Sequence, residues 1–176
     1  MPVTTLDLFT TAVQTSTGDE PWVNVNNVLA EAGESQCDYP ATDGVFSEYI
    51  QTSLPLAGAQ VPPVSKIDFI RIEISTYGNT AASTSYVIRN VSILPGFTAV
   101  GDISLNEGSP QTEVFEGDLA YWNLTEEEAL QFVAGVNPLE LRHQKSGTGT
   151  GGESYVVWVK CQITYSKKQI PAPLLF

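Results

Sequence analysis

The side chains that could carry out chemistry are few and scattered along the chain. There is a single histidine, His143, and there are two cysteines, Cys37 and Cys161. Zinc sites need such residues at recurring spacings, but the sequence has no CxxC pair and no HxxxH pair. A Ser-His-Asp triad stays open as an alternative, although no GxSxG motif supports it. We therefore expect His143 to be an exposed residue at a strand end. Cys161 lies in an apolar strand pattern, and we expect it to be a buried thiol.

Carboxylates are more numerous, and a suitably spaced pair could hydrolyse a glycosidic bond. No two of them form a distinctive pair, and no DxDxDG spacing of a calcium loop occurs. Calcium held by loop oxygens near Asp38 and Asp43 stays open as an alternative, and otherwise we expect no cofactor. The sequence therefore favours a protein that is not an enzyme. The carboxylates considered are Asp38, Asp43, Glu48, Asp68, Glu73, Asp102, Glu107, Glu113, Glu116 and Asp118.

Aromatic side chains could instead form a platform on which sugar rings stack. The stretch AYWNL at 120–124 could present such a platform. Most tryptophans of a small β-sandwich pack in its core, so we favour core packing. The aromatic residues considered are Trp22, Trp122, Trp158, Tyr39 and Tyr121.

Two further motifs have structural explanations. The stretch GTGTGG at 147–152 lacks the lysine of a phosphate-binding loop and precedes a strand, so it predicts a hairpin loop. The acidic run 126–128 follows Thr125, which is a natural N-cap, and Glu128 stands at the capping-box position. We expect a helix over 124–133 that Gly135 and Pro138 end.

The negative net charge of the chain disfavours two classes of partner. The chain of 176 residues has 20 Asp and Glu against 8 Lys and Arg, which gives a net charge of −12. Phosphate backbones and anionic membranes repel such a chain, so we expect neither nucleic acid nor membrane as a partner. The N-terminus has no basic region followed by an apolar core, so we expect no signal peptide and synthesis in a cytoplasm.

Alternating apolar residues indicate strands along most of the chain. Segment 66–75 places Ile70, Ile72 and Ile74 on one face, while Ile67 and Phe69 have the opposite parity. That change of parity indicates either two covered faces or a bulge. Segment 85–94 reads as the next strand, joined to the first by a polar loop with a turn at Gly78-Asn79.

Segment 154–166 predicts a long central strand. Its residues Tyr155, Val157, Val159, Cys161, Ile163 and Tyr165 share one parity. Together with weaker strands these segments predict an all-β fold, an antiparallel two-sheet sandwich of jelly-roll type with one short helix and extended terminal arms. We expect an N-terminal arm or first strand at 1–19, a β-sandwich domain at 20–166 and a C-terminal tail at 167–176.

The order of segments resembles that of structural proteins of tailed bacteriophages. The residues that carry the resemblance are PWVNVNNVLAEAG, ATDGVFSEYI and LPL in the first third, then KIDFIRIEIS and SYVIRNVSIL, and later Trp122-Asn123 before the helix and the strand 154–166. The resemblance covers roughly residues 20–166 and carries over no functional residue. Proteins of this class decorate capsids or build tail and fibre parts on a jelly-roll or related sandwich.

The resemblance implies a capsid decoration, or cement, protein at the capsid surface of a virion. Its partners would be the major capsid protein or other virion proteins, and a homo-oligomer, favoured as a trimer, would form. The alternatives are a tail, baseplate or fibre receptor-binding protein and a carbohydrate-binding module. The terminal segments would be the docking parts, either on a neighbour or, for the apolar tail end, in a groove of the same domain. The docking residues expected are Leu6, Leu8, Phe9, Lys167, Lys168, Ile170, Leu174, Leu175 and Phe176.

Overall fold

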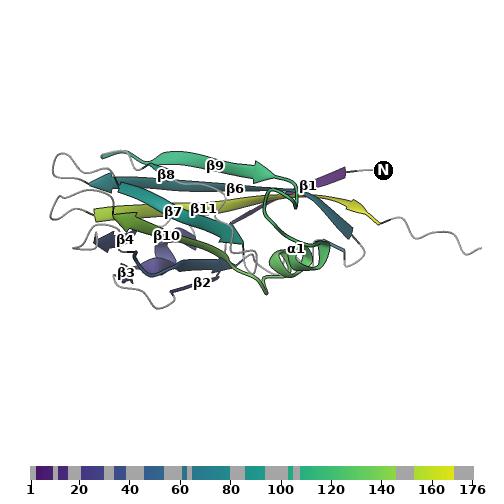
Figure 1. Cartoon of the computed structure of the whole chain (residues 1–176), viewed down its shortest axis with the longest axis horizontal. Helices are drawn as coiled ribbons and strands as arrows, with labels where there is room; N and C mark the ends of the chain where they lie inside the picture. The colour runs from purple at the N-terminus through teal and green to yellow at the C-terminus, as the bar shows by residue number, and fades with distance from the viewer. Residues whose placement is uncertain are drawn as a thin grey trace, which may run out of the picture.

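The chain folds into two antiparallel β-sheets that lie face to face. The computed structural model describes residues 3–9, 12–15, 21–29, 34–38, 46–53, 61–62, 65–79, 86–93, 103–104, 108–145 and 153–168. Figure 1 shows the two layers of strands, with the helix α1 (Glu126–Val133) packed at one end of them. The predicted all-β sandwich of jelly-roll type with a short helix is therefore confirmed.

The first sheet is built around two long strands. These are β6 (Ser65–Asn79) and β11 (Glu153–Lys167), which pair along nearly their whole length. On its other edge β11 pairs first with β4 (Ser35–Asp38) and then with β1 (Val3–Phe9). The sheet is completed by β3 (Trp22–Val23) beside β4 and by β9 (Gln111–Gly117) beside β6.

The second sheet has shorter strands. Its order is β2 (Ala12–Thr15), β5 (Ile50–Ser53), β10 (Leu139–Lys145), β7 (Tyr86–Ile93) and β8 (Ile103–Ser104). A short 3-10 helix, Val25–Leu29, follows β3. The buried apolar residues of both sheets form one core with α1, whose Ala129, Phe132 and Val133 face inward.

Two bulges set which side chains face the core. In β6 the residues Ile70, Ile72 and Ile74 are fully buried, as predicted. The register with β11 shifts at Asp68, so Ile67 is also buried, and the bulge is the correct one of the two alternatives.

The second bulge corrects the expected facing of β11. The register shifts between Val156 and Trp158, so Ser154 and Val156 face the core on one side of the shift. Beyond it Val159, Cys161 and Ile163 are buried, as predicted. The inserted residue reverses the parity, so Tyr155 does not share the core-facing side with Cys161.

Two predicted neighbours belong to different sheets. β6 lies in the first sheet and β7 in the second, so these consecutive strands are not neighbours within one sheet. The segment 146–152 joins β10 of the second sheet to β11 of the first, so it is not a hairpin loop. In a two-sheet sandwich a chain connection can cross between the layers as readily as it can turn back within one, and local sequence signals do not distinguish these routes.

The first residues of the chain form strands. Of the two alternatives for 1–19, the structure has β1 in the first sheet and β2 in the second. β1 pairs with β11 from Val3 opposite Ser166 to Phe9 opposite Lys160, and the hydroxyls of Thr5 and Thr164 are 3.2 Å apart. The start of the described chain is thereby fixed beside its end.

The helix begins as the sequence predicts. The backbone N–H of Glu128 donates to Thr125 Oγ1 at 3.2 Å, and the N–H of Thr125 donates to Glu128 Oε2 at 2.8 Å, which closes a capping box. Gly135 follows the C-cap Ala134 with a φ of 74°, a left-handed conformation that favours glycine. The acidic run 126–128 is therefore a helix start.

Candidate functional site

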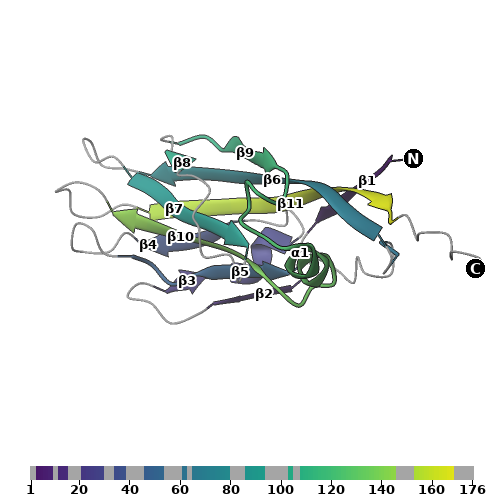
Figure 2. The same cartoon turned by 45° about the vertical axis from the view of Figure 1, so that its right-hand side comes forward.

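The pairing of β1 with β11 brings two distant parts of the sequence together at one end of the sandwich. We call this region the terminal end and define it by Val3, Ser65–Asp68, Asp118–Ala120, Glu126 and Ser166–Lys168. Val3 lies opposite Ser166, and Ser65 lies opposite Lys167 across the sheet. Figure 2 shows the start of β1, the end of β11 and α1 gathered at this end.

Three lysines lie at the terminal end, beside three carboxylates, Asp68, Asp118 and Glu126. Lys66, Lys167 and Lys168 lie there, and these are three of only eight basic residues in the chain. Lys168 Nζ is 2.7 Å from Glu126 Oε2, and Lys66 Nζ is 3.5 Å from Asp68 Oδ1. The lysine side chains of both pairs are about half exposed, at 50% and 52%, so each pair contributes little to stability and its lysine remains accessible to a partner.

The lysine contact also acts on the helix terminus. The hydrogen-bonded pair with Lys168 lowers the pKa of Glu126 below its ordinary value. Glu126 stands in the first turn of α1, where the helix dipole also favours a negative charge. An exposed charge pair thus connects the end of β11 to the start of α1.

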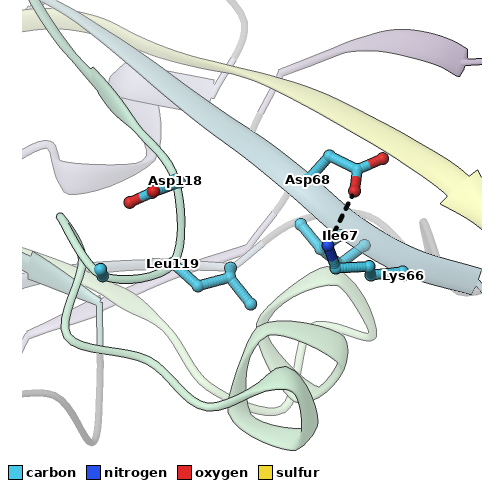
Figure 3. Close-up of a pocket in the computed structure, with 6 residues that line it drawn as sticks. Lys66, Ile67, Asp68, Asp118 and Leu119 are labelled. Carbon is cyan, nitrogen blue, oxygen red and sulfur yellow. Dashed lines mark ion pairs between the residues drawn. The ribbon is translucent and has the colours of Figure 1, made fainter.

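A shallow hollow lies between β6 and the turn that precedes α1. It is lined by Lys66, Ile67, Asp68 and 118–120 and has a volume of about 180 Å³. Figure 3 shows the Asp118 carboxylate turned away from Lys66, and Asp118 Oδ1 accepts a hydrogen bond from the Tyr121 N–H at 3.1 Å. Small-molecule sites usually enclose about 300–1,000 Å³, so this hollow suits a side chain of a protein partner better than a free ligand.

The predicted docking residues have different positions. Leu6 is half-buried and packs against the core of its own domain. Leu8 and Phe9 lie in β1, opposite Cys161 and Lys160. Lys167 and Lys168 are exposed at the terminal end. Ile170, Leu174, Leu175 and Phe176 lie outside the described residues, and the docking role of the whole set stays a prediction.

A pair of tyrosines marks the other end of the two long strands. Tyr77 of β6 lies opposite Tyr155 of β11, and their rings stack with centroids 4.5 Å apart and planes 9° from parallel. The Tyr155 hydroxyl donates a hydrogen bond to Glu153, and Tyr77 is hydrogen-bonded to Glu34. Partial burial, followed by the contact with Glu34, raises the pKa of Tyr77 well above its ordinary value.

There is a physical reason why the sequence does not predict this tyrosine pair. Its two members are far apart in sequence, and their contact depends on the pairing of β6 with β11, which no local signal encodes. A second missed cluster is Arg142, whose guanidinium carbon lies 3.7 Å from the centre of the Phe46 ring and 4.4 Å from that of Tyr49. This cation–π cluster joins β10 to residues just before β5.

Two of the three tryptophans, Trp22 and Trp122, are core residues. Trp22 is 6% exposed and Trp122 is 1% exposed, and the Trp122 Nε1–H donates to the Ile70 carbonyl at 3.1 Å. Trp158 is half-buried at the β11 bulge, and Tyr121 is 40% exposed with its ring edge-on to Trp122. Because Trp122 is enclosed, the AYWNL stretch does not present a tryptophan platform. Tyr39 lies outside the described residues.

The two cysteines are far apart. Cys161 is buried and free, as predicted, and burial raises the pKa of its thiol. Cys37 lies opposite Ser154 of β11, seven residues from Cys161 along that strand. At a rise of about 3.3 Å per residue the separation is roughly 20 Å, which excludes a disulfide between them within this fold.

Of the remaining residues considered for chemistry, Glu73 and Glu116 come together on the Arg71 guanidinium, while Asp102 and Glu107 lie outside the described residues. The backbone of His143 lies in β10 opposite Ile88. In the part of the chain that the structure describes, no group of three His, Cys, Asp or Glu side chains is placed to hold a metal ion. Asp43 and the rest of its loop lie outside that part. No helix among the described residues is long and apolar enough to cross a membrane.

Comparisons with known proteins give only distant likenesses. No family model and no curated protein matches the sequence. Solved structures similar to the chain include a truncated AlyQ with CBM32 and alginate lyase domains, at a TM-score of 0.40 and 12% identity over 96% of this chain and 35% of that one. Peanut lectin has a TM-score of 0.41 and 9% identity over 97% of this chain and 100% of that one.

A third similar structure comes from a phage. It is the enzymatically active domain of bacteriophage CBA120 tailspike protein 4, with a TM-score of 0.36 and 11% identity over 94% of this chain and 19% of that one. The chain spans about a third of the AlyQ chain and a fifth of the tailspike chain. All three scores are low, and no activity or partner is carried over from these proteins.

Proposed function

We propose that the chain is a non-enzymatic structural protein of a virion, a capsid decoration protein that docks on the major capsid protein through its terminal end. The observation that carries the proposal is the register of β1 on β11. This register places the start of β1 and the end of β11 side by side, together with three of the eight basic residues. The sequence resemblance to tailed-phage structural proteins supplies the virion setting.

The distribution of charge supports a docking role for this end. The chain has a net charge of −12, yet Lys66, Lys167 and Lys168 are exposed together on the terminal end. Oppositely charged patches steer two proteins into register, while like charges on the remaining surface disfavour other orientations. An acidic patch on the capsid protein is the complementary partner, and homotrimers on the capsid are the favoured assembly.

Labelling of intact particles tests the proposal. Antibodies raised against the purified protein are applied to particles from the source culture and are located by electron microscopy. Label spread evenly over the heads is the expected result. Label confined to tails or tail tips would replace the capsid role by the tail, baseplate or fibre alternative, and particles without label would refute the virion setting.

A second candidate function is carbohydrate binding, which the Tyr77–Tyr155 pair favours. Each ring has one face turned away from its partner, and Glu34 and Glu153 place carboxylate oxygens beside the hydroxyls. Stacked aromatic faces next to hydrogen-bond acceptors are suited to sugars. Binding on a glycan array that is lost in Tyr155→Ala and kept in Tyr121→Ala would support this function, and an array without binding would exclude it for the glycans printed.

A further inference from the structure

We infer that Tyr77 and Tyr155 form an oxidative cross-linking site, at which removal of one electron from each ring joins them as an intrachain dityrosine. The two rings lie on the central strand pair of the first sheet, one residue directly opposite the other. Their centroids are 4.5 Å apart and their planes are 9° from parallel. The inference concerns these two side chains alone and does not depend on the docking function.

The backbone keeps the two rings together. Tyr77 and Tyr155 are held in register by the ladder of β6 and β11, in which Thr76 pairs with Val156 on one side and Gly78 with Ser154 on the other. Directly opposed residues of antiparallel strands have Cβ atoms about 4.5–5.5 Å apart. An oxidised ring therefore meets its partner without any movement of the backbone, and this intrachain encounter is far more frequent than a collision between two molecules.

Both rings are half-buried, so part of each ring remains accessible to solvent. Their backbone neighbours Thr76, Gly78, Ser154 and Val156 are buried on the opposite face of the sheet, which puts the two rings on the outer face. A small diffusible oxidant reaches this face. The outer position also leaves room for one ring to tilt out of the stack, which the new bond between the two rings requires.

Each phenol has a proton acceptor in place. The Tyr155 hydroxyl donates a hydrogen bond to the carboxylate of Glu153, and the Tyr77 hydroxyl is hydrogen-bonded to Glu34. A phenol that loses an electron becomes a strong acid, so an adjacent carboxylate accepts the proton as the electron leaves. The two carboxylates therefore favour the loss of a proton, and with it an electron, from this pair.

The reaction balances as follows. Each tyrosine gives up one electron to a one-electron oxidant and one proton to its carboxylate, and each becomes a phenoxyl radical. The radicals form a carbon–carbon bond between the ring positions next to the hydroxyls, and each of these carbons then loses its hydrogen as a proton while the ring regains its hydroxyl proton. The sum is two electrons and two protons lost, with peroxodisulfate as the final electron acceptor when it is reduced to two sulfates.

Photo-oxidation of the full-length protein tests the site. A ruthenium tris-bipyridyl complex, visible light and peroxodisulfate are applied to the dilute protein, and dityrosine fluorescence is recorded. The expected product is a monomer lighter by two hydrogen atoms, whose digest contains one peptide joining Tyr77 to Tyr155. Tyr77→Phe and Tyr155→Phe keep the stacked rings but should each lower the fluorescence several-fold.

Matched variants separate the pair from general tyrosine oxidation. Tyr121→Phe removes a hydroxyl from a tyrosine that is 40% exposed and should leave the yield unchanged. Glu153→Gln and Glu34→Gln should lower the yield because the proton acceptor is lost. Oxidation should also raise the thermal unfolding midpoint of the wild type and leave that of Tyr77→Phe unchanged, because the cross-link closes a long loop of the unfolded chain. Undiminished fluorescence in Tyr77→Phe, or a digest in which other tyrosines are joined, would overturn the inference.

Discussion

Trp122 shows how a single residue connects the turn before α1 to the central sheet. Its side chain is 1% exposed, and its indole N–H donates to the carbonyl of Ile70 at 3.1 Å. Its neighbour Tyr121 is 40% exposed and contributes an edge-on ring contact. Two adjacent aromatic residues thus have opposite roles, one in the core and one at the surface.

Replacement of Trp122 should therefore lower the stability of the domain. Trp122→Ala should lower the free energy of unfolding by about 3–5 kcal/mol, because it removes a large buried side chain and leaves a cavity. Chemical denaturation measures this value, and Tyr121→Ala is the control, for which we expect a much smaller loss. Equal losses in the two variants would mean that Trp122 does not hold this packing role.

The capping box predicts a pH dependence of stability. Hydrogen bonds from the Thr125 backbone and then from its side chain lower the pKa of Glu128 below its ordinary value of 4.5. The charged form is favoured in the folded state, so this contribution is present above 4.5 and is lost as the pH falls through the lower folded-state pKa. Glu128→Gln should thus be less stable than the wild type at neutral pH and equally stable in strong acid. Denaturation curves at both pH values check this, and a constant difference would contradict it.

At the scale of elements, a charged residue lies on the edge strand of the first sheet, as the described strands define it. β9 is the last strand of the sheet order, and Val114 on it is 41% exposed. Glu116 lies two residues further along the same face, and its carboxylate is 2.7 Å from Arg71 of β6. A charged residue on an exposed edge opposes the pairing of sheets from two molecules.

Removal of this charge should promote association. Glu116→Val creates an apolar stripe with Val114 along the edge, so it should increase concentration-dependent light scattering of the folded protein. Glu127→Val makes the same change in charge on an exposed position of α1 and should leave scattering unchanged. Equal scattering from both variants would indicate an effect of net charge alone.

The elements also show which features could be predicted from sequence. The helix start was predictable because all of its signals lie between Thr125 and Glu128. The buried face of β6 was predictable because alternation of Ile70, Ile72 and Ile74 is local as well. Whether β6 pairs with β7 or with β11 depends on contacts between distant segments, and the bulge near Val156 has no local signature. The tyrosine pair depends on both of these non-local features, so it could not be predicted.

At the scale of the whole molecule, the sandwich has two chemically different ends. The terminal end holds the paired ends of β1 and β11, three lysines and the start of α1. The tyrosine pair lies toward the opposite end of β6 and β11, between two glutamates. An acidic body with one lysine-bearing end is suited to orient itself on an acidic partner.

The five lysines of the chain allow this account to be tested directly. Lys66, Lys167 and Lys168 lie at the terminal end, Lys160 lies within β11, and Lys145 ends β10, which runs away from α1 (Figure 1). The measurement is lysine-specific cross-linking of intact particles followed by mass spectrometry. We predict cross-links to other virion proteins from Lys66, Lys167 and Lys168 and few from Lys145 or Lys160. Cross-links to other virion proteins mainly from Lys145 and Lys160 would contradict docking through the terminal end.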